Sequence, residues 1–381
     1  MRNRWNILAW SVLGLVFAGM SLYLILHPDR TGVVPNYRHA STHWWAGENI
    51  YDPGTHGFLY APSFAVVFTL FNLIRPEILG EILWRAFGFG LFAFGLQSLS
   101  ACSLQPQDSS ASRLPHSTFF FLVFLAVPAS LASLNNGQTN LPLSACLVLT
   151  ALALRGQRWA IAGSLLTVAL LLKPIALAPW LLAFAVFTPV RRYLLAGILG
   201  LGILSFLHPS PEYAWQQQLG FFHKLSDSYT PENLRVSDFM GALGKAGFGI
   251  APGLEKGIRA VASLAALVYL LRTVRGHGMA AGAWGLWVAS ALVFTIFNPR
   301  AETNGYVLIS PLLAFAAISR WQEGAGGRWK GIALAAACIG LMCDGMGLMI
   351  YRATDVWLKP LIVLVVSPLL FRVPEEWERE A

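Results

Sequence analysis

The chain has 381 residues, of which 56% are hydrophobic and 12% are charged, and its mean hydropathy is +0.57. A soluble domain carries about twice that charged fraction, so the composition excludes an ordinary soluble protein and predicts one integral membrane domain over residues 1–381. The net charge of +8 comes without a nucleic-acid-binding motif, and basic loops on the cytoplasmic side of a membrane explain it better.

Long apolar runs recur along the chain and predict an all-α polytopic membrane protein with about twelve transmembrane helices. The expected spans lie near 7–27, 82–103, 117–134, 139–154, 159–172, 175–188, 193–207, 257–271, 278–297, 304–319, 330–347 and 355–371. The run 62–74 is apolar but short and ends at Arg75-Pro76, so we expect it to lie in or on the outer leaflet without crossing.

The basic residues predict the orientation. If 62–74 does not span, fourteen of the 27 basic residues fall on the same side as the N-terminus, in short turns with little else. The positive-inside rule then places both termini in the cytoplasm, and we expect a bacterial inner (plasma) membrane. The periplasmic face receives two long outer segments, 28–81 and 208–256, so any chemistry is expected there.

The first outer segment is expected to carry interfacial or re-entrant helices. "NYRHASTHWWAG" predicts a short helix that places Trp44 and Trp45 at the level of the lipid headgroups. In "YDPGTHGFLYAP", glycines and prolines form turns on which Asp52, His56 and Tyr60 converge. The second segment predicts an amphipathic helix near 212–225.

The turn "NNGQTN" joins two expected spans. Asn136, Gln138 and Asn140 are neutral donors and acceptors suited to sugar hydroxyls. The alternative is that these residues cap the helices on either side of Gly137. Either way, they are expected at the outer face.

Two further outer turns carry charge. In "LLLKPIAL", Lys173 lies among apolar residues, where it suits a phosphate group or snorkels to the headgroups. In "FNPRAETNGY", Arg300, Glu302 and Asn304 share one turn, where Arg300 suits a phosphate or pairs with Glu302. These turns predict a site for a lipid that carries a phosphate and a sugar, with cations on the phosphate and a carboxylate deprotonating the acceptor hydroxyl.

The segments "WWAGENIY", "FLYAPSFAVVFTLF", "NNGQTNLPL", "AIAGSLLTVALLLKP" and "NPRAETNGYVLISP" together resemble glycosyltransferase family 87 over roughly residues 35–320. These are polyprenol-phosphate-mannose-dependent mannosyltransferases of the C-type glycosyltransferase superfamily. The resemblance implies a multi-span fold with a catalytic first outer loop. It also implies transfer of a hexose, mannose in the family, from a polyprenyl phosphate to a lipid or glycan acceptor, with inversion and with no metal or cofactor.

The resemblance leaves the catalytic base open. The family carries an aspartate some fourteen residues before the glycine that aligns with Gly47, and Val33 stands there, while Tyr37 occupies the place of the family's following tyrosine. The base is therefore Asp29, Asp52 or Glu302, or it is missing. Two other functions stay open: a transporter or flippase of a lipid-linked or anionic solute, and a non-catalytic relative that binds a glycan lipid.

Overall fold

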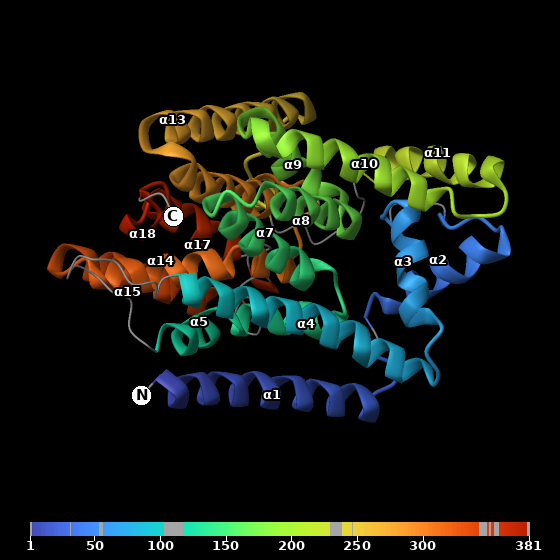
Figure 1. Cartoon of the computed structure of the whole chain (residues 1–381), viewed down its shortest axis with the longest axis horizontal. Coiled ribbons are helices and arrows are strands. Elements are labelled where there is room, and N and C mark those ends of the chain that lie inside the picture. The colour runs from blue at the N-terminus through green and yellow to red at the C-terminus, as the bar shows by residue number, and fades with distance from the viewer. Residues whose placement is uncertain are drawn as a thin grey trace.

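The computed structural model describes residues 2–30, 32–52, 56–102, 117–228, 238–245, 247–342, 349, 352–353 and 358–378. The secondary structure of these residues is helical (Figure 1). The helices are α1 (Arg2–Leu26), α2 (Val34–Ala46), α3 (Pro62–Asn72), α4 (Glu77–Cys102), α5 (Thr118–Ala126), α6 (Leu131–Asn136), α7 (Asn140–Arg155), α8 (Trp159–Leu172), α9 (Leu177–Val186), α10 (Arg191–Ser205), α11 (Pro211–Asp227), α12 (Phe239–Lys245), α13 (Pro252–Leu292), α14 (Ser310–Gln322), α15 (Ala325–Leu341), α17 (Leu358–Val366) and α18 (Glu375–Glu378).

Helix α7 lies at the centre of the bundle. It packs against α4, α8 and α13, and all but two of its sixteen residues are buried. A helix that is apolar around its whole circumference must be covered on every side, which explains this place. Helix α1 runs along the edge of the bundle, and most of its apolar side chains are exposed, as expected of a helix that faces lipid.

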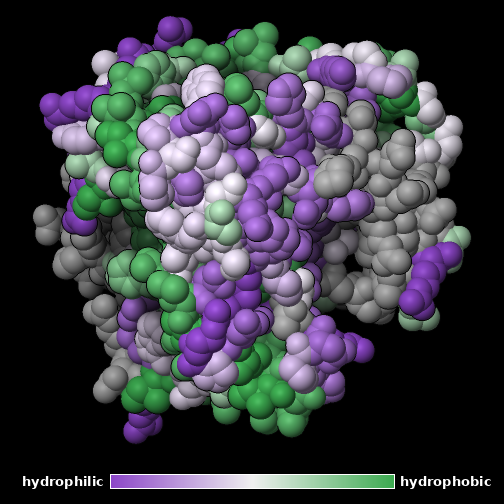
Figure 2. Space-filling view, turned by 90° about the vertical axis from the view of Figure 1, so that its right-hand side faces the viewer, coloured by the Kyte–Doolittle hydropathy of each residue, from purple (hydrophilic) through white to green (hydrophobic). Residues whose placement is uncertain are grey.

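The two ends of the bundle differ in chemistry. One end, where the N and C labels lie in Figure 1, is called the basic end below. Arg155 lies in the last turn of α7, Arg320 in the last turn of α14, and Arg372 shortly before α18. There Arg320 donates to the main-chain oxygen of Arg372, and the Arg155 guanidinium lies 5.5 Å from the centre of the Trp377 ring. The opposite end, called the polar end, carries α2, α3, α11 and several connecting turns. Figure 2 looks onto this end and shows hydrophilic residues gathered in its middle, with hydrophobic residues around them.

The structure contains fewer long helices than the sequence predicts. Among the described residues, four helices are long and apolar enough to cross a membrane, namely Arg4–Leu26, Glu77–Ala101, Thr118–Asn136 and Pro252–Phe297. A fifth span is possible if the bent pair Pro174–Val186 and Thr188–Ser205 crosses as one. A membrane core of about 30 Å needs about 20 helical residues, whereas α7 has 16 and α8 has 14. The described parts of the twelve apolar runs are largely helical, but their lengths do not show twelve spans.

Breaks within helices explain part of this difference. The expected spans 257–271 and 278–297 fall on one stretch that is interrupted at Gly278, whose φ is 84°. Glycine takes this conformation without the steric cost that a Cβ would add. The expected spans 175–188 and 193–207 form the pair bent by 116°. Hydropathy detects each apolar segment but not the angle between consecutive ones.

The short helices at the polar end follow the sequence prediction in part. Helix α3 has 11 residues, too few to span, as expected for 62–74. Helix α2 is present, and Trp45 is half exposed, with its indole N–H donating to Thr69 Oγ1 at 2.8 Å. The expectation for Trp44 is wrong, because this ring is fully buried and packs against His208 and Tyr213 instead of facing the headgroups.

Candidate functional site

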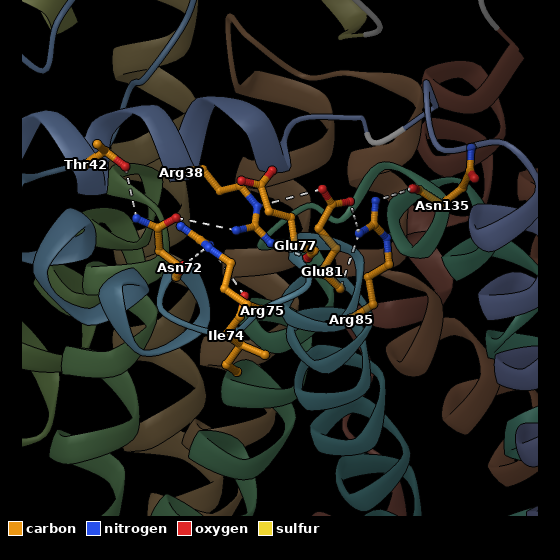
Figure 3. Close-up of polar contacts among 9 residues, drawn as sticks. All are labelled: Arg38, Thr42, Asn72, Ile74, Arg75, Glu77, Glu81, Arg85 and Asn135. Atoms are coloured by element: carbon orange, nitrogen blue, oxygen red, sulfur yellow. Dashed lines mark hydrogen bonds and ion pairs between the residues drawn. The ribbon is translucent and has the colours of Figure 1, made fainter.

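The turn between α6 and α7 is held at its main chain. Gly137 takes a left-handed conformation, with φ of 63°, and its N–H and that of Gln138 donate to the last carbonyls of α6. From α4, the Trp84 indole N–H donates to Gly137 O at 2.7 Å. Arg85 donates to Leu134 O at 3.1 Å and to Asn135 O at 3.0 Å (Figure 3). The capping interpretation is therefore correct for the backbone. The side chains of the residues after Gly137 do not cap the helix and make hydrogen bonds elsewhere.

A buried charge cluster, formed by Arg38, Glu81 and Arg85, supports this turn through Arg85. Glu81 lies 3.2 Å from Arg85 and 3.8 Å from Arg38, and all three side chains are buried (Figure 3). Arg38 also donates to the main-chain oxygen of Glu77, so the cluster joins α2 to the start of α4. The sequence analysis did not select these residues. A helical i, i+4 Glu–Arg pair within an apolar helix is the signal that could have found Glu81 and Arg85.

Four of the expected site residues form one chain of hydrogen bonds. Lys173 Nζ donates to Asn140 Oδ1 at 2.8 Å, and Asn140 Nδ2 donates to Gln138 Oε1. Gln138 Nε2 donates to Glu302 Oε2 at 3.0 Å. Asn304 lies beside this chain, with its Oδ1 3.4 Å from Asn140 Nδ2. The structure thus brings together residues from three turns that the sequence analysis had selected separately.

Tyrosine hydroxyls line the same region. Tyr37 and Tyr60 share a hydrogen bond of 2.8 Å, and Tyr60 OH lies 3.4 Å from Thr139 Oγ1. Burial raises the pKa of Tyr37 well above 10, and nearby Tyr60 and the Glu302 charge raise it further. Burial also raises the pKa of Tyr60, and Glu302 adds to this. Both hydroxyls therefore stay neutral near pH 7. One of the two protons makes the bond between them, and the other hydroxyl can donate to a polar substrate.

Several cations reach this end of the bundle. Arg300 and Glu302 both lie close enough to Lys173 to act on its charge, and Arg300 donates to the main-chain oxygen of Ser228 at the end of α11. Burial lowers the pKa of Arg300, and the Glu302 carboxylate opposes that shift. A group of cations around one carboxylate is suited to an anionic ligand.

Two of the cations are not among the site residues that the sequence predicts. Lys224, on the buried face of α11, donates to Asp52 O at 2.6 Å. Lys359 is buried and donates to Thr303 O at 2.9 Å, directly after Glu302. The Lys-Pro pair at 359–360 repeats the one at 173–174 and was available as a signal. The burial of Lys224 could not be read from its neighbours in sequence.

The other expected site residues lie outside the hydrogen-bonded chain. Asp29 is exposed beyond the end of α1. The Asp52 side chain is 56% exposed, and its carboxylate lies 3.7 Å from His39 Nε2. His56 is exposed, whereas the main-chain oxygen of Asn136 accepts from Val33 N at 3.0 Å. Of the three acids considered as the base, Glu302 is the one that the structure joins to Lys173.

Helix α11 fixes the segment that follows α2. Where the sequence predicts an amphipathic helix near 212–225, one face of α11 meets residues 48–52 at regular intervals. Tyr213 OH donates to Glu48 O, Gln217 Oε1 accepts from Ile50 N at 3.2 Å, and Lys224 reaches Asp52 O. Gly220 lies between them against the Tyr51 ring.

Substitution of Gly220 by Val is expected to loosen this contact. A Cβ at Gly220 would lie 3.1 Å from Tyr51 Cδ2, and overpacking of this kind costs about 1–3 kcal/mol. We expect the apparent Tm to fall by about 2–6 °C. The matched control is Gly200→Val in α10, where a Cβ meets nothing within 4 Å. Equal Tm changes in the two variants would show that the α11 contact does not stabilise the fold.

The geometry defines a class: a helical protein with candidate membrane-spanning helices and a polar, cation-rich site at one end of its bundle. The sequence model of glycosyltransferase family 87 matches residues 58–299, and the chain belongs to this family. The predicted resemblance is thereby confirmed, and membership implies a transferase that takes a sugar donor and an acceptor. No curated protein and no solved structure matches the chain.

The extent of the family match has a consequence for the site. It includes Gln138, Asn140 and Lys173, but it ends just before Arg300, Glu302 and Asn304. Asp29 and Asp52 precede it. The match therefore covers three of the four residues of the hydrogen-bonded chain, the lysine and the two amides, and it leaves the identity of the base to geometry.

Proposed function

We propose that the protein transfers a hexose, mannose by analogy with the family, from a polyprenyl-phosphate donor to a lipid or glycan acceptor at the outer face of a bacterial inner membrane. The observation that carries the proposal is the hydrogen-bonded chain from Lys173 to Glu302. It places a cation and a carboxylate in one polar site, as transfer from a sugar phosphate requires.

The proposed chemistry is a direct displacement. Glu302 accepts the proton of the acceptor hydroxyl while that oxygen forms a bond to the anomeric carbon of the donor. The bond from this carbon to the phosphate oxygen breaks, and the phosphate leaves with the electron pair. Lys173 and Arg300 stabilise the charge that develops on it, so the side chains of the protein supply the electrophilic assistance. A single displacement inverts the anomeric configuration.

The remaining expected residues would bind the sugar and the acceptor. In this proposal, the hydroxyls of Tyr37 and Tyr60 and the amide of Asn304 face the sugar, and His56 and Asn136 lie at the rim. The proposal includes the predicted topology of about twelve passes, with the basic end in the cytoplasm and the polar end outside. The position of Arg155, Arg320 and Arg372 at one end supports this orientation.

The test is donor turnover by the purified full-length protein in nanodiscs, with radiolabelled polyprenyl-phosphate mannose and a membrane lipid extract. Wild-type protein is expected to transfer label to a lipid or glycan product. Lys173→Met is expected to weaken donor binding about 10- to 100-fold, because a charge-assisted hydrogen bond to phosphate is lost. Donor that is bound but never consumed would support a non-catalytic binding protein. Donor that crosses a vesicle membrane unchanged would support a flippase.

A further inference from the structure

Lys173, Asn140, Gln138 and Glu302 have a fixed hydrogen-bond direction. An ammonium group only donates hydrogen bonds, and a carboxylate only accepts them. With Lys173 at one end, Asn140 must present Oδ1 to it, and with Glu302 at the other end, Gln138 must present Nε2. The bond from Asn140 Nδ2 to Gln138 Oε1 then fits in one direction only. The two charged ends therefore determine the orientation of both amides.

The surroundings of Asn140 agree with this direction. Ser133 Oγ donates its proton to Asn304 O at 2.7 Å, so the lone pairs of Ser133 are available to Asn140 Nδ2, which lies 3.4 Å away. Asn304 Oδ1, also 3.4 Å from Asn140 Nδ2, is a second acceptor. Asn140 and Ser133 are fully buried, so water does not substitute for these partners.

We propose that Gln138 and Asn140 form an oriented hydrogen-bond relay from Lys173 that positions the Glu302 carboxylate, in place of the sugar-binding role that their sequence suggests. The relay holds Glu302 Oε2, so Oε1 is the oxygen that receives the acceptor proton. This last statement rests on the proposed function. The relay itself does not, because it is a property of the four side chains.

The direction of the relay can be reversed by substitution. In Asn140→Asp, residue 140 still accepts from Lys173, but it can no longer donate to Gln138. Gln138 must then turn its Nε2 toward the new carboxylate at position 140 and its Oε1 toward Glu302, where two acceptors meet. Adding Glu302→Gln supplies a donor at that end and removes the excess negative charge. The double variant N140D/E302Q therefore restores a complete chain in which Lys173 still donates to residue 140 and the two hydrogen bonds of Gln138 run in the opposite direction.

The experiment measures thermal unfolding of the purified full-length variants in nanodiscs, which needs no substrate. N140D is expected to lower the apparent Tm by about 4–8 °C, and N140D/E302Q to recover at least half of this loss. The decisive control compares N140D with N140D/E302Q again, this time in the Gln138→Leu background. If the recovery came only from balancing the charges at positions 140 and 302, it would not need Gln138. Recovery that persists in the Gln138→Leu background overturns the relay, and so does no recovery in N140D/E302Q.

A second control tests specificity. Ser144, one turn along α7 from Asn140, donates to Val307 O at 3.0 Å and so joins the same helix to the same loop. Ser144→Ala should lose stability that Glu302→Gln does not recover. If Glu302→Gln also rescues Ser144→Ala, its effect is general and the relay is overturned.

Turnover separates the relay from the proposed function. If wild-type protein consumes no donor but N140D/E302Q recovers its Tm, the proposed function fails and the relay stands. If wild-type protein is active, Gln138→Leu is expected to lower kcat about 10- to 100-fold with the donor KM nearly unchanged. A change confined to KM would instead assign Gln138 to sugar binding and overturn its positioning role.

Discussion

Glu302→Gln is expected to lower sugar transfer by about 10²–10⁴-fold, because a general base of this kind contributes that much to the rate. The substitution keeps the size of the side chain and can keep the hydrogen bond from Gln138. Donor binding should therefore persist, since the proposed phosphate contacts are Lys173 and Arg300. Single-turnover transfer and donor binding are measured on the same preparation.

The other two candidate bases, Asp29 and Asp52, are tested in the same assay. Asp29→Asn and Asp52→Asn remove acids that lie outside the relay, and both side chains are exposed. Loss of transfer in either variant, with transfer retained in Glu302→Gln, would assign the base to the first outer segment. The assignment of Glu302 would then be wrong, although the family would stand.

Glu81→Gln is expected to destabilise the protein by about 3–5 kcal/mol, because it leaves the buried Arg38 and Arg85 without their carboxylate. Desolvated charges that lose a partner cost more than the pair itself contributes. Arg85 also holds the main chain of the turn between α6 and α7, so the site should loosen with the fold. The loss is measured by denaturant unfolding in micelles, followed by tryptophan fluorescence.

The matched control is Glu77→Gln, one turn earlier in α4, where the side chain is exposed and Arg38 uses only the main-chain oxygen. A change of less than about 0.5 kcal/mol is expected there. Equal losses of unfolding free energy in the two variants would mean that the buried position of Glu81 does not contribute to it. The cluster seen in Figure 3 would then not stabilise the fold.

The parts of this molecule that could be predicted are those that depend on local sequence. Apolar runs predict helices, and the short run 62–74 correctly predicts a helix too short to span. Turn residues predict the cap at Gly137. Each of the three polar turns was also selected from its sequence as a separate element, because polar and charged side chains are costly among apolar neighbours.

The remaining features depend on contacts between distant residues. Gln138 and Glu302 are separated by 164 positions, and no spacing rule relates them. Lys224 is buried on the face of α11 that meets residues 48–52, which lie far away in the sequence. Trp44 was expected at the headgroups because its sequence is that of an aromatic belt, but His208 and Tyr213 cover it. The twelve-span prediction counted apolar runs, and helix breaks such as Gly278 do not change hydropathy.

The contact between α11 and residues 48–52 also bears on biosynthesis. The hydrogen bonds that fix this segment join residues 165 to 172 positions apart, so the segment leaves the ribosome well before its partners do. The Lys173 end of the relay likewise precedes Glu302 in synthesis. The turns that carry Gln138, Asn140 and Lys173 are therefore translated while Glu302 is still missing, and water or lipid headgroups must satisfy them in the interval. A nascent chain that stops short of residue 302 can hold most of its helices and still have no site, so maturation of the enzyme is completed by its last third.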